Sequence, residues 1–336
     1  MTAEMFTFAD PDRAPLEAAW NWDGRMPRGH VVLIAGWRES AKGLVACNLA
    51  GAMTTGRPLP GEDGPSEPGD VVMISAEDDA CEDMAWRLRA AGADLGRVHD
   101  LSSLPDGSPF ELSASKTSPG NVPELLAYLR MLRDEGRNPR LVVLDPLNAL
   151  VMDGSIKTDQ GARRVIGRLE RVAQRTGVTI AVVHHFVKSG AIGGSQGLVD
   201  APRWVYEIKP DPMSPEYKIF HLSKCNVAAA EDLRYKIIRD GHDSRIEWVE
   251  RADVERETRA WRNRKLATVI SLPDRAPDVA RELVTVALRT APGSDAETLA
   301  RITELDVATV QGVLDALEGE GAVKAKRKLF RKRKKR

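Results

Sequence analysis

Apolar and polar positions follow two patterns along the first two thirds of the chain. Four short runs rich in Val, Ile and Leu are typical of buried strands, and they cover residues 31–35, 71–75, 141–144 and 179–183. Apolar residues at helical spacing predict helices over residues 43–54, 80–92, 122–135 and 160–176. Strands separated by helices predict an α/β fold, with a mostly parallel sheet covered by helices on both faces.

The pattern changes after Gly197. Strands without intervening helices are predicted over residues 204–209, 217–223, 234–239 and 245–249. We expect them to form an antiparallel C-terminal extension of the same sheet. The sheet domain is therefore placed at 29–250, after an N-terminal segment, 1–28, that shows no clear period. The charged stretch 251–276 ends near prolines and indicates a linker.

The last part of the chain has its own pattern. Amphipathic spacing predicts helices over 277–290 and 306–318. Between them, a capping-box pattern at 294–297 predicts the start of another helix. Gly321 and a basic strand follow, and this order resembles a small winged-helix domain, placed at 277–322. The predicted recognition helix carries three acids and no Lys or Arg, which argues against base readout. Contact with protein, structural capping and contact with DNA stay open as its roles.

Charge is distributed unevenly. The chain has 49 Lys+Arg and 49 Asp+Glu, but residues 323–336 hold ten of the bases and no acid, which leaves an acidic body. Such a segment predicts a disordered basic tail whose favoured partner is a phosphate backbone. An anionic membrane or an acidic protein would satisfy the same charge. The candidate nucleic-acid-binding residues here are Lys324, Lys326, Arg327, Lys328, Arg331, Lys332 and Arg333.

Membrane and secreted classes do not fit the sequence. No apolar stretch approaches the roughly 20 residues that cross a bilayer, and the acidic start lacks the pattern of a signal peptide. Cys47, Cys81 and Cys225 are widely spaced, which argues against a disulfide framework and a zinc site. We expect a soluble, cytoplasmic protein with reduced thiols and no membrane partner.

The loop between the first predicted strand and helix carries the strongest chemical signal. Its sequence, GWRESAKG at 36–43, approaches the P-loop pattern G-x-x-x-x-G-K-S/T, in which backbone N–H groups and Lys bind phosphates and the hydroxyl binds Mg²⁺. Lys42 is kept, but Ala41 replaces the second glycine and Gly43 replaces the hydroxyl residue. The loop alone favours a phosphate site and a structural turn equally. The candidate nucleotide-binding residues are Gly36, Trp37, Arg38, Glu39, Ser40, Ala41, Lys42, Gly43 and Leu44.

Two later strands end in polar side chains. The run LVVLD ends in Asp145, the Walker B arrangement, in which a carboxylate beside the P-loop holds Mg²⁺. His184 and His185 follow the strand 179–183, and they have no Cys or acid at zinc-ligand spacing. Taken singly, each of these residues is also explained as an ordinary polar group at a strand end.

Six blocks in this order resemble the RepA-like, AAA-type branch of the RecA/DnaB superfamily, a group that includes plasmid and phage helicases. The blocks are GWRESAKG (36–43), ISAEDD (74–79), LVVLDPLNAL (141–150), VVHHFVKSG (182–190), GGSQGLVDAPRWV (193–205) and LSKCNVA (222–228). The resemblance covers about residues 25–250. It implies a RecA-like ring ATPase that binds ATP and Mg²⁺ between subunits.

The resemblance also implies a role for each site residue. Lys42 would contact the β- and γ-phosphates, Asp145 would hold Mg²⁺, Glu77 would polarise the attacking water and His185 would sense the γ-phosphate. Arg87 or Arg89 would stack on adenine. Lys224 with Asn226 would reach the neighbouring subunit's nucleotide and stabilise the charge on the transferring phosphoryl group.

The same resemblance assigns the loops 152–160 and 186–197 to the DNA-facing centre of a ring. In the second, Lys188, Ser189 and Gly190 would follow a phosphate backbone without reading bases. The alternative is a mobile glycine-rich loop that has no role in binding DNA.

These features lead to one main hypothesis and two others. The main one is an ATP-dependent, hexameric, helicase-like motor on single-stranded DNA, with possible replication proteins as partners of the C-terminal domain. The second is a nucleotide-responsive DNA-binding or replication accessory protein with weak or no ATPase activity, as Ala41 and Gly43 would favour. A recombinase-type or clock-type ring switch is a weaker third.

Overall fold

The protein is seen in a computed structural model in which two compact units are described separately. The described residues are 19–37, 39–76, 83–151, 155–186, 195–211, 214, 216–225, 230–240, 243–271, 276–290 and 294–319. The first unit comprises Met1–Lys209 with Ile219–Trp248, and the second comprises Pro210–Lys218 with Val249–Arg336.

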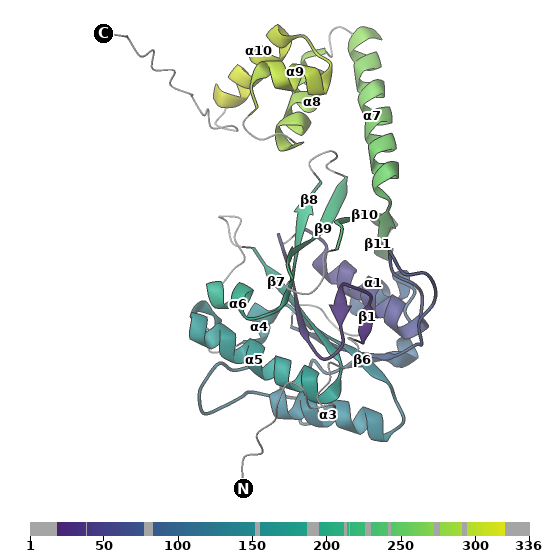
Figure 1. The fold of residues 1–336 in the computed structure, drawn as a ribbon, viewed down its shortest axis with the longest axis vertical. Coiled ribbons are helices and arrows are strands. Elements are labelled where there is room, and N and C mark those ends of the chain that lie inside the picture. The colour runs from purple at the N-terminus through teal and green to yellow at the C-terminus, as the bar shows by residue number, and fades with distance from the viewer. Residues whose placement is uncertain are drawn as a thin grey trace, which may run out of the picture. The chain divides into compact units, whose positions relative to one another are not determined.

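A large sheet organises the first unit. Figure 1 shows this sheet. Within the described residues it has nine strands in the order β11-β10-β9-β8-β3-β7-β6-β4-β5. Their bounds are β3 Val31–Gly36, β4 Asp70–Ser75, β5 Val98–Asp100, β6 Pro139–Asp145, β7 Thr179–His185, β8 Trp204–Pro210, β9 Tyr217–Lys224, β10 Leu233–Asp240 and β11 Asp243–Val249. The strands β5, β4, β6, β7, β3 and β8 pair in parallel. The predicted mostly parallel sheet is confirmed.

The predicted antiparallel extension begins one strand later than expected. We expected it to start at residue 204, but β8 pairs with β3 in parallel. The reason is the connection from β7 to β8, which contains the short helix α6, Gln196–Asp200, and is long enough for a crossover. The later neighbours β9, β10 and β11 are joined by short connections, which only antiparallel pairs allow.

Helices cover both faces of the sheet, as predicted. Their bounds in this unit are α1 Lys42–Thr55, α2 Ala85–Ala90, α3 Val122–Asp134, α4 Leu147–Leu150 and α5 Asp159–Thr176. Alternate residues of β3 belong to different cores because side chains of a strand point to opposite faces. Val31 and Leu33 pack in the cluster that contains residues of α3 and α5, whereas Val32 and Ile34 pack in the cluster that contains α1.

Helix α5 shows how local sequence starts and ends an element. The Thr158 hydroxyl oxygen accepts a hydrogen bond from the Gly161 backbone N–H at 3.1 Å and caps the first turn. Val165 and Leu169 lie on its buried face. Gly177 follows with φ of +60°, a conformation that ends many helices. The observed helix differs from the predicted 160–176 by a single residue.

Two short pieces of sheet have no counterpart in the predicted elements. β1, Trp20–Trp22, and β2, Met26–Pro27, form an antiparallel pair inside the segment that shows no clear period. The edge strand β5 is three residues long and partly exposed. Elements of two or three residues are too short to show a period.

The segment predicted as a linker is mostly helical. Helix α7 runs from Arg251 to Ser271, over most of 251–276. Ion pairs between Arg251 and Glu255 and between Asp253 and Arg256 link successive turns. Opposite charges three or four residues apart stabilise a helix, so a run of mixed charges forms a helix here, and its role as a linker stays a prediction.

Three predicted C-terminal helices are present. They are α8 Ala276–Thr290, α9 Ala296–Thr303 and α10 Val307–Gly319, and their shared core contains Val284, Leu299 and Val310. The cap of α9 is Asp295, whose carboxylate accepts from the Thr298 backbone N–H at 2.8 Å, where a capping box from Ser294 was predicted. Gly321 and the basic strand lie outside the described residues, so the winged helix stays a prediction.

One of the acids that argued against base readout has a structural role. The Asp306 carboxylate accepts hydrogen bonds from the Thr309 hydroxyl at 2.6 Å and its backbone N–H at 2.9 Å, at the start of α10. These bonds hold the pKa of Asp306 below its usual value.

None of the helices in the described part of the chain has the length and apolar character that crossing a bilayer requires.

At the amino end of β4, Asp70 joins three segments of the first unit. Its side chain is fully buried and accepts hydrogen bonds from the Asn138 backbone N–H at 2.9 Å and from His99, whose Nε2 lies 3.0 Å away. Arg97 and Arg137 each lie 3.6 Å from it. Burial opposes the charge, but these partners outweigh it and hold the pKa of Asp70 below its usual value.

We predict that Asp70→Asn lowers the free energy of unfolding by about 2 kcal/mol at pH 7, because charged hydrogen bonds are lost. A lowered pKa in the folded state means that the carboxylate stabilises the protein fully above its unfolded pKa of about 4 and less as the pH falls below it. Urea unfolding at several pH values should therefore show the difference shrinking below about pH 4. The exposed Asp134→Asn is the control, and an equal effect from both substitutions would contradict the account.

Candidate functional site

The functional residues predicted at strand ends meet at one edge of the sheet. In the parallel register, Gly36 at the end of β3 is opposite His185 of β7 and Ile208 of β8. Ser75 at the end of β4 is opposite Asp145 of β6, and the Ala76 backbone N–H donates to the Asp145 carbonyl at 3.2 Å. The loop 36–43, His185, Asp145 and the chain that leads to Glu77 therefore all leave the sheet at its carboxyl edge.

Hydrogen bonds shape the loop 36–43 before it enters α1. The Ser40 backbone N–H donates to the Trp37 carbonyl at 3.1 Å, and the Ser40 hydroxyl donates to the same oxygen at 2.7 Å. From β10, the Tyr235 hydroxyl donates to the Ser40 carbonyl at 2.6 Å. Burial raises the pKa of Tyr235, which keeps this donor protonated. The loop is thus anchored by a distant strand.

Lys42 places a positive charge inside this loop. Only 3% of its surface is exposed, and its Nζ donates to the carbonyls of Gly36 at 3.1 Å and Trp37 at 2.6 Å. Lys42 is also the first residue of α1, and the orphan N–H groups of a helix N-terminus favour anions. A buried ammonium beside a helix N-terminus is the arrangement that binds phosphate.

Gly36 leaves no room for a side chain. A Cβ on this residue would lie 2.6 Å from the Ser40 hydroxyl and 3.1 Å from Cβ of Ile208. The first glycine of the pattern is required here by packing against β8 and the loop itself.

Ala41 stands at the second glycine position in a left-handed conformation. Its φ and ψ are +60° and +35°, and it caps α1, whose first hydrogen bond runs from the Val45 backbone N–H to the Ala41 carbonyl at 3.0 Å. A residue with a Cβ adopts this conformation at a cost of roughly 1–2 kcal/mol. Ala41 therefore holds a left-handed conformation that a glycine at this position would adopt without strain.

At the hydroxyl position, Gly43 faces two charged side chains. A Cβ there would lie 3.1 Å from Asp145 Oδ2 and 3.8 Å from Nη1 of Arg87. Asp145 thus lies beside the loop, as the sequence predicts. The carboxylate of a P-loop metal site is present and its hydroxyl is not, so residues 43 and 145 do not complete the usual Mg²⁺ site. The described residues contain no group of three or more His, Cys, Asp or Glu that would hold a metal ion.

Comparison with protein families agrees with this geometry. A family model described as an AAA domain matches residues 3–191, more than half of the 336-residue chain. The chain belongs to this AAA domain family. It therefore carries an AAA-type P-loop ATPase domain, and this family generally binds ATP with Mg²⁺. The matched range includes Lys42, Asp145 and His185 and ends before β8 and Lys224.

The two arginines predicted beside adenine lie differently in this AAA domain. The Arg87 guanidinium lies near Gly43, with Nη1 3.8 Å from the point where a Cβ on that residue would be. The Arg89 guanidinium lies over the ring of Trp86, 5.4 Å from its centroid. Stacking of either arginine on adenine stays a prediction.

Lys224 is engaged within its own subunit. Its Nζ donates to the carbonyls of Val199 at 3.1 Å, Asp200 at 2.7 Å and Pro202 at 2.9 Å, at the C-terminal end of α6. A cation is favoured there because the last carbonyls of a helix point outward. Its predicted contact with a neighbouring subunit's nucleotide stays a prediction.

The remaining predicted residues lie outside the residues that the structure describes. They are Arg38, Glu77, Lys188, Ser189, Gly190, Asn226, Lys324, Lys326, Arg327, Lys328, Arg331, Lys332 and Arg333. Within the described loop, Glu39 is exposed and Leu44 is half-buried.

The sequence did not indicate three residues that shape the loop. They are Tyr235 and Ile208, described above, and Phe186, whose backbone N–H donates to the Gly36 carbonyl at 3.0 Å and whose ring meets the Trp37 ring edge-on at 5.7 Å. These residues lie on other elements, and no motif links them to the loop. Only the sheet order brings them together.

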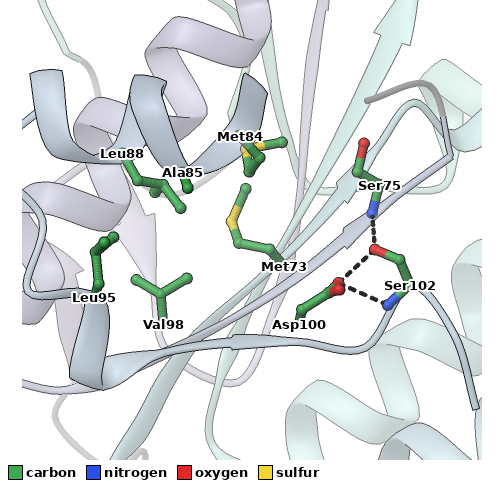
Figure 2. Close-up of a pocket in the computed structure, with 9 residues that line it drawn as sticks. All are labelled: Met73, Ser75, Met84, Ala85, Leu88, Leu95, Val98, Asp100 and Ser102. Atoms are coloured by element: carbon green, nitrogen blue, oxygen red, sulfur yellow. Dashed lines mark hydrogen bonds between the residues drawn. The ribbon is translucent and has the colours of Figure 1, made fainter. Parts of the chain in front are cut away.

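A small pocket lies beside the site, between β4, β5 and α2 (Figure 2). Its polar side is formed by Ser102, which accepts from the Ser75 backbone N–H at 2.9 Å and donates to Asp100 at 2.6 Å. The lining residues are Met73, Ser75, Met84, Ala85, Leu88, Leu95, Val98, Asp100 and Ser102. Its volume of about 170 Å³ is below the roughly 300–1,000 Å³ of typical ligand pockets, so we do not assign a nucleotide to it.

We predict that Ala41→Gly raises the free energy of unfolding by about 1 kcal/mol, because glycine adopts the left-handed conformation without strain. The control is Ala46→Gly, the same change inside α1, which should lower it by about 1 kcal/mol or more. Chemical denaturation measures both. A loss of stability at both positions would show that Ala41 is not strained.

Proposed function

We propose that this protein is an ATP-dependent, ring-forming motor on single-stranded DNA, of the replicative helicase type. One observation carries the ATP-dependent part: Lys42, Asp145 and His185 converge at the carboxyl edge of a mostly parallel sheet in an AAA domain. Open α/β sheets bind their ligands at this edge. The ring and the DNA track are supported by the six sequence blocks that resemble the RepA-like branch.

Each residue then has a defined task. Lys42 and the backbone N–H groups of the loop neutralise the β- and γ-phosphates, Glu77 orients the attacking water, and His185 hydrogen-bonds the γ-phosphate and passes its loss to the loop 186–197. Mg²⁺, when bound, would neutralise phosphate charge beside Asp145. Lys224 of one subunit completes the site of the next, which makes hydrolysis depend on assembly.

One exposed tryptophan lies in the loop at this edge. Trp37 is 40% exposed, and its ring meets the Phe186 ring edge-on. In the proposed ring, a neighbouring subunit would cover it.

The second candidate function is a nucleotide-responsive DNA-binding or replication accessory protein with little turnover. The observation that favours it is the incomplete metal site at Gly43 and Asp145. Such a protein would bind ATP and change its affinity for DNA without sustained hydrolysis.

We predict that the wild type hydrolyses ATP faster with single-stranded DNA than without it, and that Lys42→Ala and Glu77→Gln each lower the rate at least about 100-fold. Removing one group that stabilises developing charge costs this much in other enzymes. The exposed Lys116→Ala is the control for Lys42. Steady-state phosphate release is the measurement. Wild-type rates equal to those of both variants would exclude a motor and favour the second candidate.

We predict that deleting residues 323–336 flattens the salt dependence of DNA binding. Ten cations on a single strand contribute a slope of up to about 7 in log affinity against log salt. The basal ATPase rate should not change. Replacing the ten bases by Gln, which keeps the length, should reproduce the deletion. An unchanged slope would show that the tail does not contact DNA.

A further inference from the structure

We propose that the Arg87 guanidinium takes over the role of the metal in this site, so that the protein binds nucleoside triphosphate largely without Mg²⁺. This inference rests on the proposed function, because it requires the loop 36–43 to bind nucleotide. It concerns a residue and a position that the P-loop pattern does not describe.

The hydroxyl of the usual P-loop is missing at Gly43. In a P-loop, the residue after Lys supplies an oxygen to Mg²⁺, and an acid at a nearby strand end holds the ion on the other side. Gly43 has no side chain to offer. Mg²⁺ demands a nearly ideal octahedron of oxygens and releases water reluctantly, so the loss of a protein ligand weakens its site.

A cation already faces the vacant hydroxyl position. Nη1 of Arg87 and Oδ2 of Asp145 both lie within 4 Å of the point where a Cβ on Gly43 would be, at 3.8 and 3.1 Å. A positive side chain at the position where the metal's hydroxyl ligand would stand opposes the entry of a divalent cation. It also supplies part of the charge that Mg²⁺ would bring to the phosphates.

The helix that carries Arg87 is held firmly against α1. Leu88 is buried, and the Ala93 backbone N–H donates to the Leu88 carbonyl at 2.9 Å. The Asp94 backbone N–H then donates to the Thr54 hydroxyl of α1 at 3.1 Å. Arg87 therefore lies on a helix that packs against α1.

The chemistry of the guanidinium suits phosphate. It stays charged at every physiological pH, and its planar donors bind two phosphate oxygens at once. The Lys42 ammonium binds two carbonyls of the loop, and Nη1 of Arg87 lies 3.8 Å from the Cβ position of the next residue, Gly43. The site therefore holds a second cation besides the lysine of an ordinary P-loop.

The test is equilibrium binding of a fluorescent ATP analogue to the full chain, with Mg²⁺ and with EDTA. We expect the wild-type Kd to change less than about 3-fold between the two conditions. Arg87→Met keeps the aliphatic stem and removes the charge, so we expect at least a 10-fold weaker Kd in EDTA and partial recovery in Mg²⁺. Arg130→Met, an exposed arginine on α3, is the matched control and should change neither value.

A second pair of variants tests the missing hydroxyl. Gly43→Ser and Gly43→Ala place the same Cβ near Asp145, but only Ser supplies an oxygen. We expect Ser to make binding at least 5-fold tighter in Mg²⁺ than in EDTA, and Ala to show no such difference.

Three outcomes overturn the inference. A wild-type Kd that weakens more than 10-fold in EDTA, or an Arg87→Met variant that binds like the wild type in EDTA, overturns it and leaves the proposed function intact. Absence of binding in both conditions by a protein with native circular dichroism overturns the proposed function as well.

Discussion

The hydrogen bonds from the Lys42 ammonium to the carbonyls of Gly36 and Trp37 close the loop on which the site depends. They exist because β3 is held on both sides by parallel neighbours and ends at a glycine with no space around it. The chain must therefore turn sharply at Gly36 and return as α1. The turn places the buried ammonium in the loop that leads directly into the N-terminus of α1.

This loop carries strain and a buried charge, and both are balanced by contacts from elsewhere. Ala41 occupies a conformation that disfavours its methyl group, while Tyr235 from β10 holds the neighbouring carbonyl. Strained backbone persists only where the surroundings determine it, and it gathers at functional sites. At the other end of β4, a buried charge stabilises the fold. Asp70 is buried there with several partners, and His99 is one of them.

Much of the sheet domain was predictable because its elements are long and periodic. The buried strands and the amphipathic helix α5 appear within one or two residues of their expected bounds. Lys42, Asp145 and His185 were predictable because parallel strands bring their carboxyl ends to one edge. The sequence does not indicate which strands pair with each other, and for this reason the parallel pairing of β8 with β3 was not expected. The charged helix α7 was missed because its ion pairs, and not an apolar face, mark it.

Features set by packing lay beyond the sequence. Tyr235 reaches the loop only through the order of the sheet, and Arg87 reaches Gly43 only through the packing of α2 on α1. The departure at Gly43 was visible in the sequence, but its consequence depends on which side chain faces the gap. The structure places both the Asp145 carboxylate and the Arg87 guanidinium there.

The central claim is that loop 36–43 binds a triphosphate between Lys42 and Arg87. It is tested most directly by a crystal structure with a non-hydrolysable ATP analogue and Mn²⁺, with data collected at the manganese absorption edge. The account predicts phosphates inside the loop, the Arg87 guanidinium within hydrogen-bond distance of them, and no anomalous peak between the phosphates and Asp145. Phosphates bound elsewhere, or a strong manganese peak beside Asp145 with Arg87 turned away, would contradict it.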